Sequence, residues 1–295
     1  MKINLIFIRQ HAGKVFRNNK IFYFLNGLML GVLFYFYSES AYEKQLFGAI
    51  ASNISYELPT AQPSRNDSII TRSLRITHSL EKNRLTVFGA FEFKGFKAET
   101  IQPVTFDLMT GKGACGSNAY VLARILQEFQ IPVRVAQMKV NGLFGGHIIV
   151  EAKPHQRWIV LDALYELSFK RPDGNLAGFQ DVSQSWEYYR NQVPGDYNPD
   201  YRYEDVQYTN WNKVPVLMPL LRKILVWVKG EEFVQTLSLR AVFLQKFSVL
   251  FYSFLILYIL ILLIRAYLFR VYHRKKASQL LAPFQAKLSP GSRQI

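Results

Sequence analysis

The chain contains a single cysteine, Cys115, in the run GKGACGSNAYVLARIL. Small, flexible residues flank this cysteine, and apolar side chains at helical spacing predict an amphipathic helix over residues 117–129. A thiol in the first turn of a helix lies at the positive end of the helix dipole, which lowers its pKa and favours the nucleophilic thiolate. The alternative is structural, because most lone cysteines are small buried hydrophobes.

A histidine and an aspartate follow in an arrangement that would let one orient the other. We predict strands at residues 133–140, 147–152 and 157–162. If KPHQ is a four-residue turn between the last two, Ala152 faces Arg157, and His147 faces Asp162 on the same side of the sheet. A carboxylate beside an imidazole fixes its tautomer and stabilises the imidazolium ion. A one-residue slip would turn one of the two side chains to the other face.

Together these residues predict a nucleophilic site. Cys115 would attack a carbonyl carbon as the thiolate, His147 would act first as base and then as acid, and Asp162 would orient the imidazole. Each residue alone has an ordinary structural interpretation, as a buried hydrophobe, a turn residue or a cap. Their order along the chain favours the joint interpretation.

Neighbouring residues supply candidates for the other tasks of such a site. The backbone N–H groups at the helix start, that of Cys115 included, are candidate oxyanion donors, and Gln102 is the candidate side-chain donor. Gly113 and Gly116 would let a substrate acyl group approach, and with Trp158 they are the candidate substrate-binding residues. The sequence has neither closely spaced metal-ligand residues nor a phosphate-binding glycine motif, so we expect no metal and no cofactor.

Several features of residues 111–164 match a known pattern. They are a Gly-x-Cys at a helix start, an Ile-Pro-x-Arg leading into a strand, a His that begins a strand, and a Trp and an Asp in the next: Gly113 to Cys115, Gln130 to Arg134, His147, Trp158 and Asp162. This set resembles the transglutaminase-like superfamily of papain-like thiol enzymes.

The resemblance implies an α+β fold with a papain-like core, in which the helix that carries the cysteine packs on an antiparallel sheet. It also implies that Cys115 is the nucleophile, His147 the base and Asp162 its partner. The superfamily includes peptidases, amidases, acetyltransferases and inactive members, so transamidation itself is not implied.

Two uncharged apolar runs, residues 21–38 and 247–264, have the length of membrane spans. Each contains 18 residues, which as a helix gives about 27 Å, close to a hydrocarbon core of about 30 Å. The first run is longer than the ~7–15 residues of a signal-peptide core, which favours an uncleaved anchor, and cleavage is the alternative.

The net charge of +15 is concentrated outside these two runs. Residues 1–20 carry five basic and no acidic side chains, and residues 265–295 carry seven and none. By the positive-inside rule we expect both termini in the cytoplasm of an inner-membrane protein, with the region between the spans in the periplasm or outside the cell. We therefore expect membrane lipids, and not nucleic acid, as partners of the basic ends.

These features divide the chain into six segments. They are a basic tail, a span, an exported transglutaminase-like domain, interfacial helices, a second span and a basic tail: residues 1–20, 21–38, 39–213, 214–246, 247–264 and 265–295. An unpaired thiol outside the cytoplasm is exposed to oxidation, so its presence suggests a function.

Other segments have weaker patterns. Residues 42–56 predict a helix, 58–68 a loop, 84–93 a strand and 183–190 a short helix, while TRSLRITHSL (71–80) fits either a helix or a strand. A later aromatic run either stacks on a sugar or peptide ligand or attaches a long loop to the core. Its members are Tyr197, Tyr201, Tyr203, Tyr208 and Trp211.

The sequence thus predicts a membrane-anchored thiol enzyme. It would hydrolyse or transamidate an amide or ester of an envelope peptide, protein or glycoconjugate through an acyl-enzyme on Cys115. The alternative is an inactive transglutaminase-like module that serves as a scaffold or binding partner in a cell-envelope or polysaccharide assembly.

Overall fold

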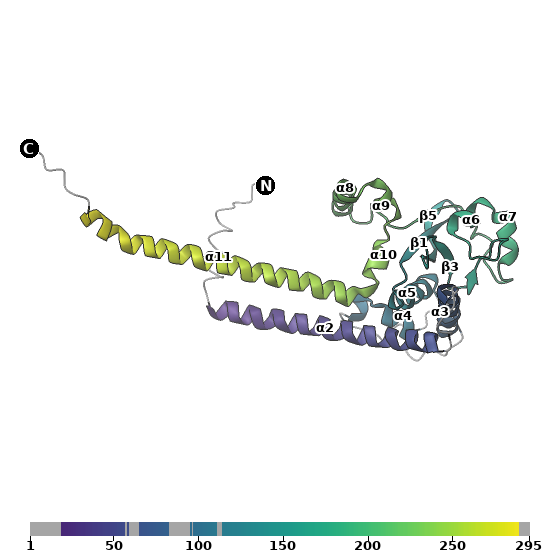
Figure 1. Ribbon diagram of the computed structural model, residues 1–295, viewed down its shortest axis with the longest axis horizontal. Coiled ribbons are helices and arrows are strands. Elements are labelled where there is room, and N and C mark those ends of the chain that lie inside the picture. The colour runs from purple at the N-terminus through teal and green to yellow at the C-terminus, as the bar shows by residue number, and fades with distance from the viewer. Residues whose placement is uncertain are drawn as a thin grey trace, which may run out of the picture. The chain divides into compact units, whose positions relative to one another are not determined.

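The protein is described here by a computed structural model that covers residues 19–56, 58, 65–82, 95, 97–110 and 114–288. The chain divides into two compact units (Figure 1). One contains the described residues up to 39 together with those from 247 onward, and the other runs from 40 to 246. The strand predicted at 84–93 lies outside the described residues.

The first unit is formed by two long helices, the N-terminal part of α2 (Asn19–Tyr56) and most of α11 (Lys246–Leu288). Both are long and apolar enough to cross a membrane. Of the most apolar 18 residues in each candidate span, only 11% in the first and 6% in the second are buried. The core helix of a soluble protein would be mostly buried. Both helices extend well beyond the predicted runs at 21–38 and 247–264.

Aromatic contacts pair these helices side by side. The Arg265 guanidinium lies 3.4 Å from the centre of the Phe22 ring, and the Phe36 and Phe254 rings are 5.4 Å apart. As the residue number rises along α2, that of its partner in α11 falls, so the two helices are antiparallel. The start of α2 and the part of α11 around Arg265 therefore lie at the same end of the pair.

The second unit contains a five-stranded antiparallel sheet in the order β4-β3-β2-β1-β5. Its strands are β1 (Val133–Val140), β2 (Leu143–Ala152), β3 (Ile159–Asp162), β4 (Leu167–Ser168) and β5 (Val206–Gln207). The predicted strand at 133–140 is confirmed with both its ends. With helices on the sheet, the α+β class is confirmed.

The register between β2 and β3 differs from the prediction by two residues. Ala152 pairs with Ile159 and not with Arg157, so the connection runs over six residues, 153–158, and not over four. Trp158 therefore lies in the loop, where its ring packs 3.9 Å from the Arg134 guanidinium. Because the shift is even, every side chain keeps its predicted face.

The second unit also contains helices and single helical turns. They are α3 (Arg65–Lys82), the π-helical turn η1 (Lys97–Ile101), α4 (Val104–Thr110), α5 (Cys115–Glu128), α6 (Phe179–Gln184), α7 (Trp186–Tyr189), the 3-10 turn η2 (Arg190–Gln192), α8 (Leu217–Lys229), α9 (Glu231–Thr236), α10 (Leu239–Val242) and the 3-10 turn η3 (Phe243–Gln245). The stretch 71–80, which fits either a helix or a strand by its pattern, is part of α3. The short helix expected at 183–190 is split between α6, α7 and η2.

The α5 helix forms the centre of the larger core. Its apolar side chains Leu122 and Ile125 are fully buried against Val135 and Val150 of the sheet, as its helical periodicity predicts. The second half of α2 contributes Phe47 to the same cluster. This packing fixes the start of α5, and with it the position of the cysteine.

Candidate active site

Cys115 is the first residue of α5. Ala114 precedes it in an extended conformation, φ −76° and ψ 148°, and the helix begins two residues earlier than its apolar periodicity suggested. The thiol is partly exposed. In the first turn of any helix the N–H groups have no intrahelical acceptor, so Cys115 lies among free donors at the positive end of the dipole.

His147 and Asp162 meet as a buried pair. Nε2–H of His147 donates to Oδ2 of Asp162 at 2.6 Å, and neither side chain is exposed. The other carboxylate oxygen accepts from the Leu164 N–H at 3.1 Å, which holds the carboxylate in place. The observed register sets Asp162 opposite Ile149, so the two residues are diagonal and not direct neighbours. Their contact is as predicted, although the register that predicted it is wrong.

The second nitrogen of the imidazole completes the arrangement. Among the described residues, Nδ1 of His147 has no hydrogen-bond partner. The Cys115 thiol lies close enough to the ring for each group to shift the pKa of the other. Nε2 is thus committed to the carboxylate and Nδ1 is left for the thiol.

These contacts set the charges of the thiol and the imidazole. Burial raises the pKa of the Cys115 thiol, but the hydrogen bond and charge of His147, with the N–H groups of Ile148 and Gly116, lower it further than burial raises it. Burial lowers the pKa of His147, while the hydrogen bonds to Asp162 and Cys115 raise it to a net value of about 9. Both shifts favour the ion pair of a thiolate and an imidazolium ion.

A tyrosine that the sequence does not single out covers the imidazole. The rings of Tyr201 and His147 are stacked, with centroids 4.1 Å apart and planes 14° from parallel. Tyr165 lies at the edge of the same ring, 6.2 Å away. The two rings cover the imidazole, and His147 has no exposed surface.

The tyrosine-rich run is largely structural. Tyr197 and Tyr203 are buried in the second core cluster, beside Phe169 and Val182, which confirms that the run attaches a long loop to the core. Tyr201 belongs to this run, so the run was the available signal. Nothing in the sequence, however, indicates which of its members reaches His147.

The predicted substrate-binding residues have different outcomes. A Cβ atom on Gly116 would lie 3.5 Å from Ile148, an ordinary contact, so sterics do not require glycine there. Gly113 lies outside the described residues. Trp158 lines a groove with Arg134 and Glu151, and the thiol does not belong to that lining.

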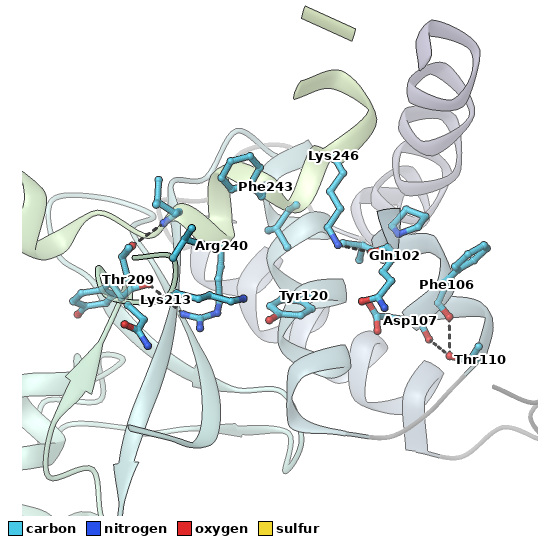
Figure 2. A pocket seen from close by; sticks show the side chains of 17 residues that line it. Gln102, Phe106, Asp107, Thr110, Tyr120, Thr209, Lys213, Arg240, Phe243 and Lys246 are labelled. Atoms are coloured by element: carbon cyan, nitrogen blue, oxygen red, sulfur yellow. Dashed lines mark hydrogen bonds between the residues drawn. The ribbon is translucent and has the colours of Figure 1, made fainter. Parts of the chain in front are cut away.

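Gln102, the predicted oxyanion side chain, lines another cavity (Figure 2). Its neighbours there include Asp107 and Tyr120, and the lining contains neither Cys115 nor His147. The role of Gln102 stays a prediction. The backbone N–H groups at the start of α5 stay the nearest candidates for that task.

The site contains the parts of a thiol nucleophile and a proton carrier. In the described residues no three His, Cys, Asp or Glu side chains gather closely enough to hold a metal ion.

Comparison with known proteins gives no relative. No family model matches the chain, and no curated protein or solved structure is significantly similar to it. The interpretation of the site depends on its geometry.

Proposed function

We propose that the protein is a membrane-anchored thiol enzyme that transfers an acyl group from an amide or ester through Cys115. One observation carries the proposal. An imidazole held at 2.6 Å by a buried carboxylate has its other nitrogen unpartnered among the described residues, and a partly exposed thiol at the start of a helix lies close enough for the two groups to shift each other's pKa. A purely structural cysteine needs none of these partners.

The first half-reaction uses the thiolate and imidazolium as they stand. The sulfur of Cys115 attacks the carbonyl carbon, a C–S bond forms, and the carbonyl electrons move to oxygen. When the oxyanion collapses, the bond from carbon to the leaving nitrogen or oxygen breaks. His147 gives its Nδ1 proton to that leaving group and becomes neutral.

The second half-reaction returns the enzyme to its starting state. Neutral His147 takes a proton from water or from an acceptor amine, which attacks the thioester and expels the thiolate. Water gives hydrolysis and an amine gives transamidation. An envelope peptide, protein or glycoconjugate is the substrate class that fits an exported, membrane-anchored site.

The fold supports a transglutaminase-like assignment. The helix that begins with the cysteine packs on an antiparallel sheet, and the sheet carries His147 and Asp162 on β2 and β3. This is the arrangement that the resemblance of residues 111–164 implies. On this basis we propose that fold for the second unit.

The two apolar helices support a two-pass topology. Their antiparallel pairing supports placing the basic N-terminal and C-terminal segments on the same side of the membrane, which the positive-inside rule makes the cytoplasm. Residues 39–246 then face the periplasm or the cell exterior. A reporter that is active only outside the cytoplasm should be active when fused after residue 100 and inactive when fused at residue 295, and the opposite pattern would reverse the topology.

The α8 helix supports contact with the membrane surface. None of its residues is buried, and its apolar side chains are exposed, Trp227 to 87% and Leu217 to 62%. An amphipathic helix with an uncovered apolar face is typical of helices that lie in the interface of a bilayer. Quenching of Trp227 fluorescence by brominated lipids in vesicles tests this placement.

Trapping the acyl-enzyme tests the activity. The full-length protein is incubated with envelope extract and quenched with acid, and the mass of the peptide that contains Cys115 is measured. An acyl adduct on Cys115 that is lost in His147→Ala supports the enzyme. An unmodified thiol that reacts with iodoacetamide only after denaturation would instead support the inactive scaffold.

A further inference from the structure

A cavity of about 560 Å³ lies in the second unit, away from the thiol. It is lined by residues between 102 and 120 and by residues between 208 and 246. Figure 2 shows Tyr120 near its centre, with Arg240 and Lys213 on one side and Lys246, Gln102 and Asp107 on the other.

The charges around this cavity are unbalanced. Among the described residues that line it, Lys213, Arg240 and Lys246 are basic, whereas Asp107 is the one acidic residue. Asp107 also accepts a hydrogen bond from the Ser117 hydroxyl at 2.9 Å, so part of its capacity is used by α5. The lining therefore carries a net charge of about +2.

The cations lie close enough together to affect one another. Burial lowers the pKa of Lys246, the charge of Lys213 lowers it as well, and the carboxylates of Asp107 and Glu43 act in the opposite direction. The Lys246 ammonium donates to the Gln102 carbonyl at 2.5 Å, which directs it into the cavity (Figure 2). An anion in the cavity would relieve the repulsion between these lysines.

Hydroxyl and amide groups extend the polar side of the cavity, and apolar side chains form the other. Tyr120 and Asn210 can donate hydrogen bonds, whereas Phe243 and Leu244 are apolar. Lys246, which lines the cavity, is followed at once in the chain by the apolar run 247–264. A ligand with a charged head and an apolar portion would match both sides.

The cavity lies along the first turns of the helix that begins with the thiol. Tyr120 lines it, and the ring of Tyr120 comes within 3.8 Å of the Cβ position of Gly116, the residue after Cys115. The Tyr120 hydroxyl lies close enough to Arg240 to accept a hydrogen bond from the guanidinium. A ligand in the cavity would therefore be held within a few residues of the thiol, without contact to it.

We propose that this cavity binds a phosphate group, with Arg240, Lys213 and Lys246 as its charged donors. A phosphate has several acceptor oxygens and can bond to a guanidinium and two ammonium groups at once, whereas a carboxylate has two oxygens. The phosphate belongs either to an anionic lipid headgroup or to a soluble phosphate ester. The binding step needs no reaction at the thiol.

Binding is measured on the full-length Cys115→Ala protein in a neutral detergent, so that the outcome does not depend on thiol chemistry. The probes are short-chain phosphatidylglycerol, a short-chain diacylglycerol that lacks the phosphate, and glycerol 1-phosphate. We expect saturable binding of phosphatidylglycerol, competition by glycerol 1-phosphate, and binding of the diacylglycerol that is weaker by about tenfold or more. Tighter binding of the lipid than of the ester identifies an amphiphile, and equal binding identifies a soluble ligand.

Two variants locate the site. Arg240→Gln and Lys213→Gln should each weaken phosphatidylglycerol binding by about tenfold, and Lys170→Gln, an exposed lysine outside the lining, should leave it unchanged. The Arg240 guanidinium also donates to the Tyr208 carbonyl, whereas Lys213 is exposed, so Lys213→Gln tests binding in a protein whose fold is intact. Equal affinity in all three variants, or equal binding of the two lipids, would overturn the proposal.

Discussion

Two polar clusters lie on the same face of β2, only four residues apart along the strand, and they differ in what they can do. The thiol cluster consists of Cys115, His147 and Asp162. The arginine cluster consists of Arg134, Glu151, Trp158 and Tyr208. Both are centred on a buried pair of opposite charge.

In the arginine cluster, Arg134 and Glu151 pair with each other and with two aromatic side chains. The Arg134 guanidinium lies 2.9 Å from the Glu151 carboxylate and between two rings, 3.9 Å from the centre of Trp158 and 4.3 Å from that of Tyr208. The Tyr208 hydroxyl donates to the same carboxylate at 2.5 Å. Because a guanidinium does not release its proton at any pH that the fold survives, Arg134 cannot act as an acid or a base, and its contacts hold the sheet and its covering loop together.

The thiol cluster differs from the arginine cluster in two ways. Its cation is an imidazolium, which can lose a proton, and its third member is a partly exposed nucleophile. Burial and pairing are thus common to both clusters. The difference is a titratable base with one ring nitrogen left for a thiol, and this difference is what separates a site from a structural contact.

Breaking the arginine cluster should have the largest effect on stability. Arg134→Met leaves the Glu151 carboxylate buried without its charged partner, which should cost about 3–5 kcal/mol in the free energy of unfolding. Chemical denaturation of the full-length protein in detergent measures it. The double variant Arg134→Met/Glu151→Met should recover much of the loss, and a loss that the second change does not reduce would show that the pairing is unimportant.

Removing the imidazole should change the reactivity of the thiol, and it should lower the stability of the fold less than Arg134→Met does. In His147→Ala the thiol loses its hydrogen bond and its cation, so its pKa should rise towards 8.5 and alkylation at about pH 6 should slow by about 100-fold. Iodoacetamide labelling followed by mass spectrometry checks this. In the matched control Arg134→Met, the fraction that remains folded should label at the unchanged rate.

Removing the carboxylate should lower the pH at which His147 loses its proton. Asp162 raises the pKa of His147, so in Asp162→Asn the imidazolium should lose its proton below the value of about 9. Because the folded-state pKa lies above the ordinary 6.5, the stability that His147 contributes is fully present below about pH 6.5 and is lost as the pH rises through about 9. Histidine NMR titration and unfolding across that range measure both effects, and an unshifted His147 titration in Asp162→Asn would contradict the pairing.

Replacing the stacked Tyr201 should have the smallest effect on the reactivity of Cys115. Tyr201→Leu removes the ring that holds the imidazole, and because aromatic pairs contribute about 0.5–1.5 kcal/mol, acylation of Cys115 should slow by about 2-fold to 10-fold. Tyr201→Phe keeps the ring and should stay within about twofold of the natural protein. Identical rates for the leucine and phenylalanine variants would show that the stacking does not matter.

The parts of this picture that depend on local pattern could be predicted from the sequence. Alternation placed β1 at 133–140, and periodicity placed the helix of Cys115 to within two residues at its start. Apolar runs located both candidate spans. Their helices continue further because polar residues that follow an apolar run do not by themselves end a helix.

The parts that depend on contacts between distant residues could not. The length of the β2–β3 connection depends on Trp158 packing against Arg134, and no local signal distinguishes a six-residue loop from a four-residue turn. Likewise, the stacking of Tyr201 on His147 joins residues 54 positions apart. The pair of His147 and Asp162 was predicted because its face, and not its register, decides whether the side chains meet.

The charge state of the one thiol tests the central claim most directly. The rate of iodoacetamide labelling of Cys115 is measured across pH in the folded full-length protein, where a single cysteine makes the signal unambiguous. The account predicts a midpoint clearly below the ordinary thiol value of about 8.5, and a shift to that value in His147→Ala. A midpoint at or above 8.5 that does not change in His147→Ala would contradict it.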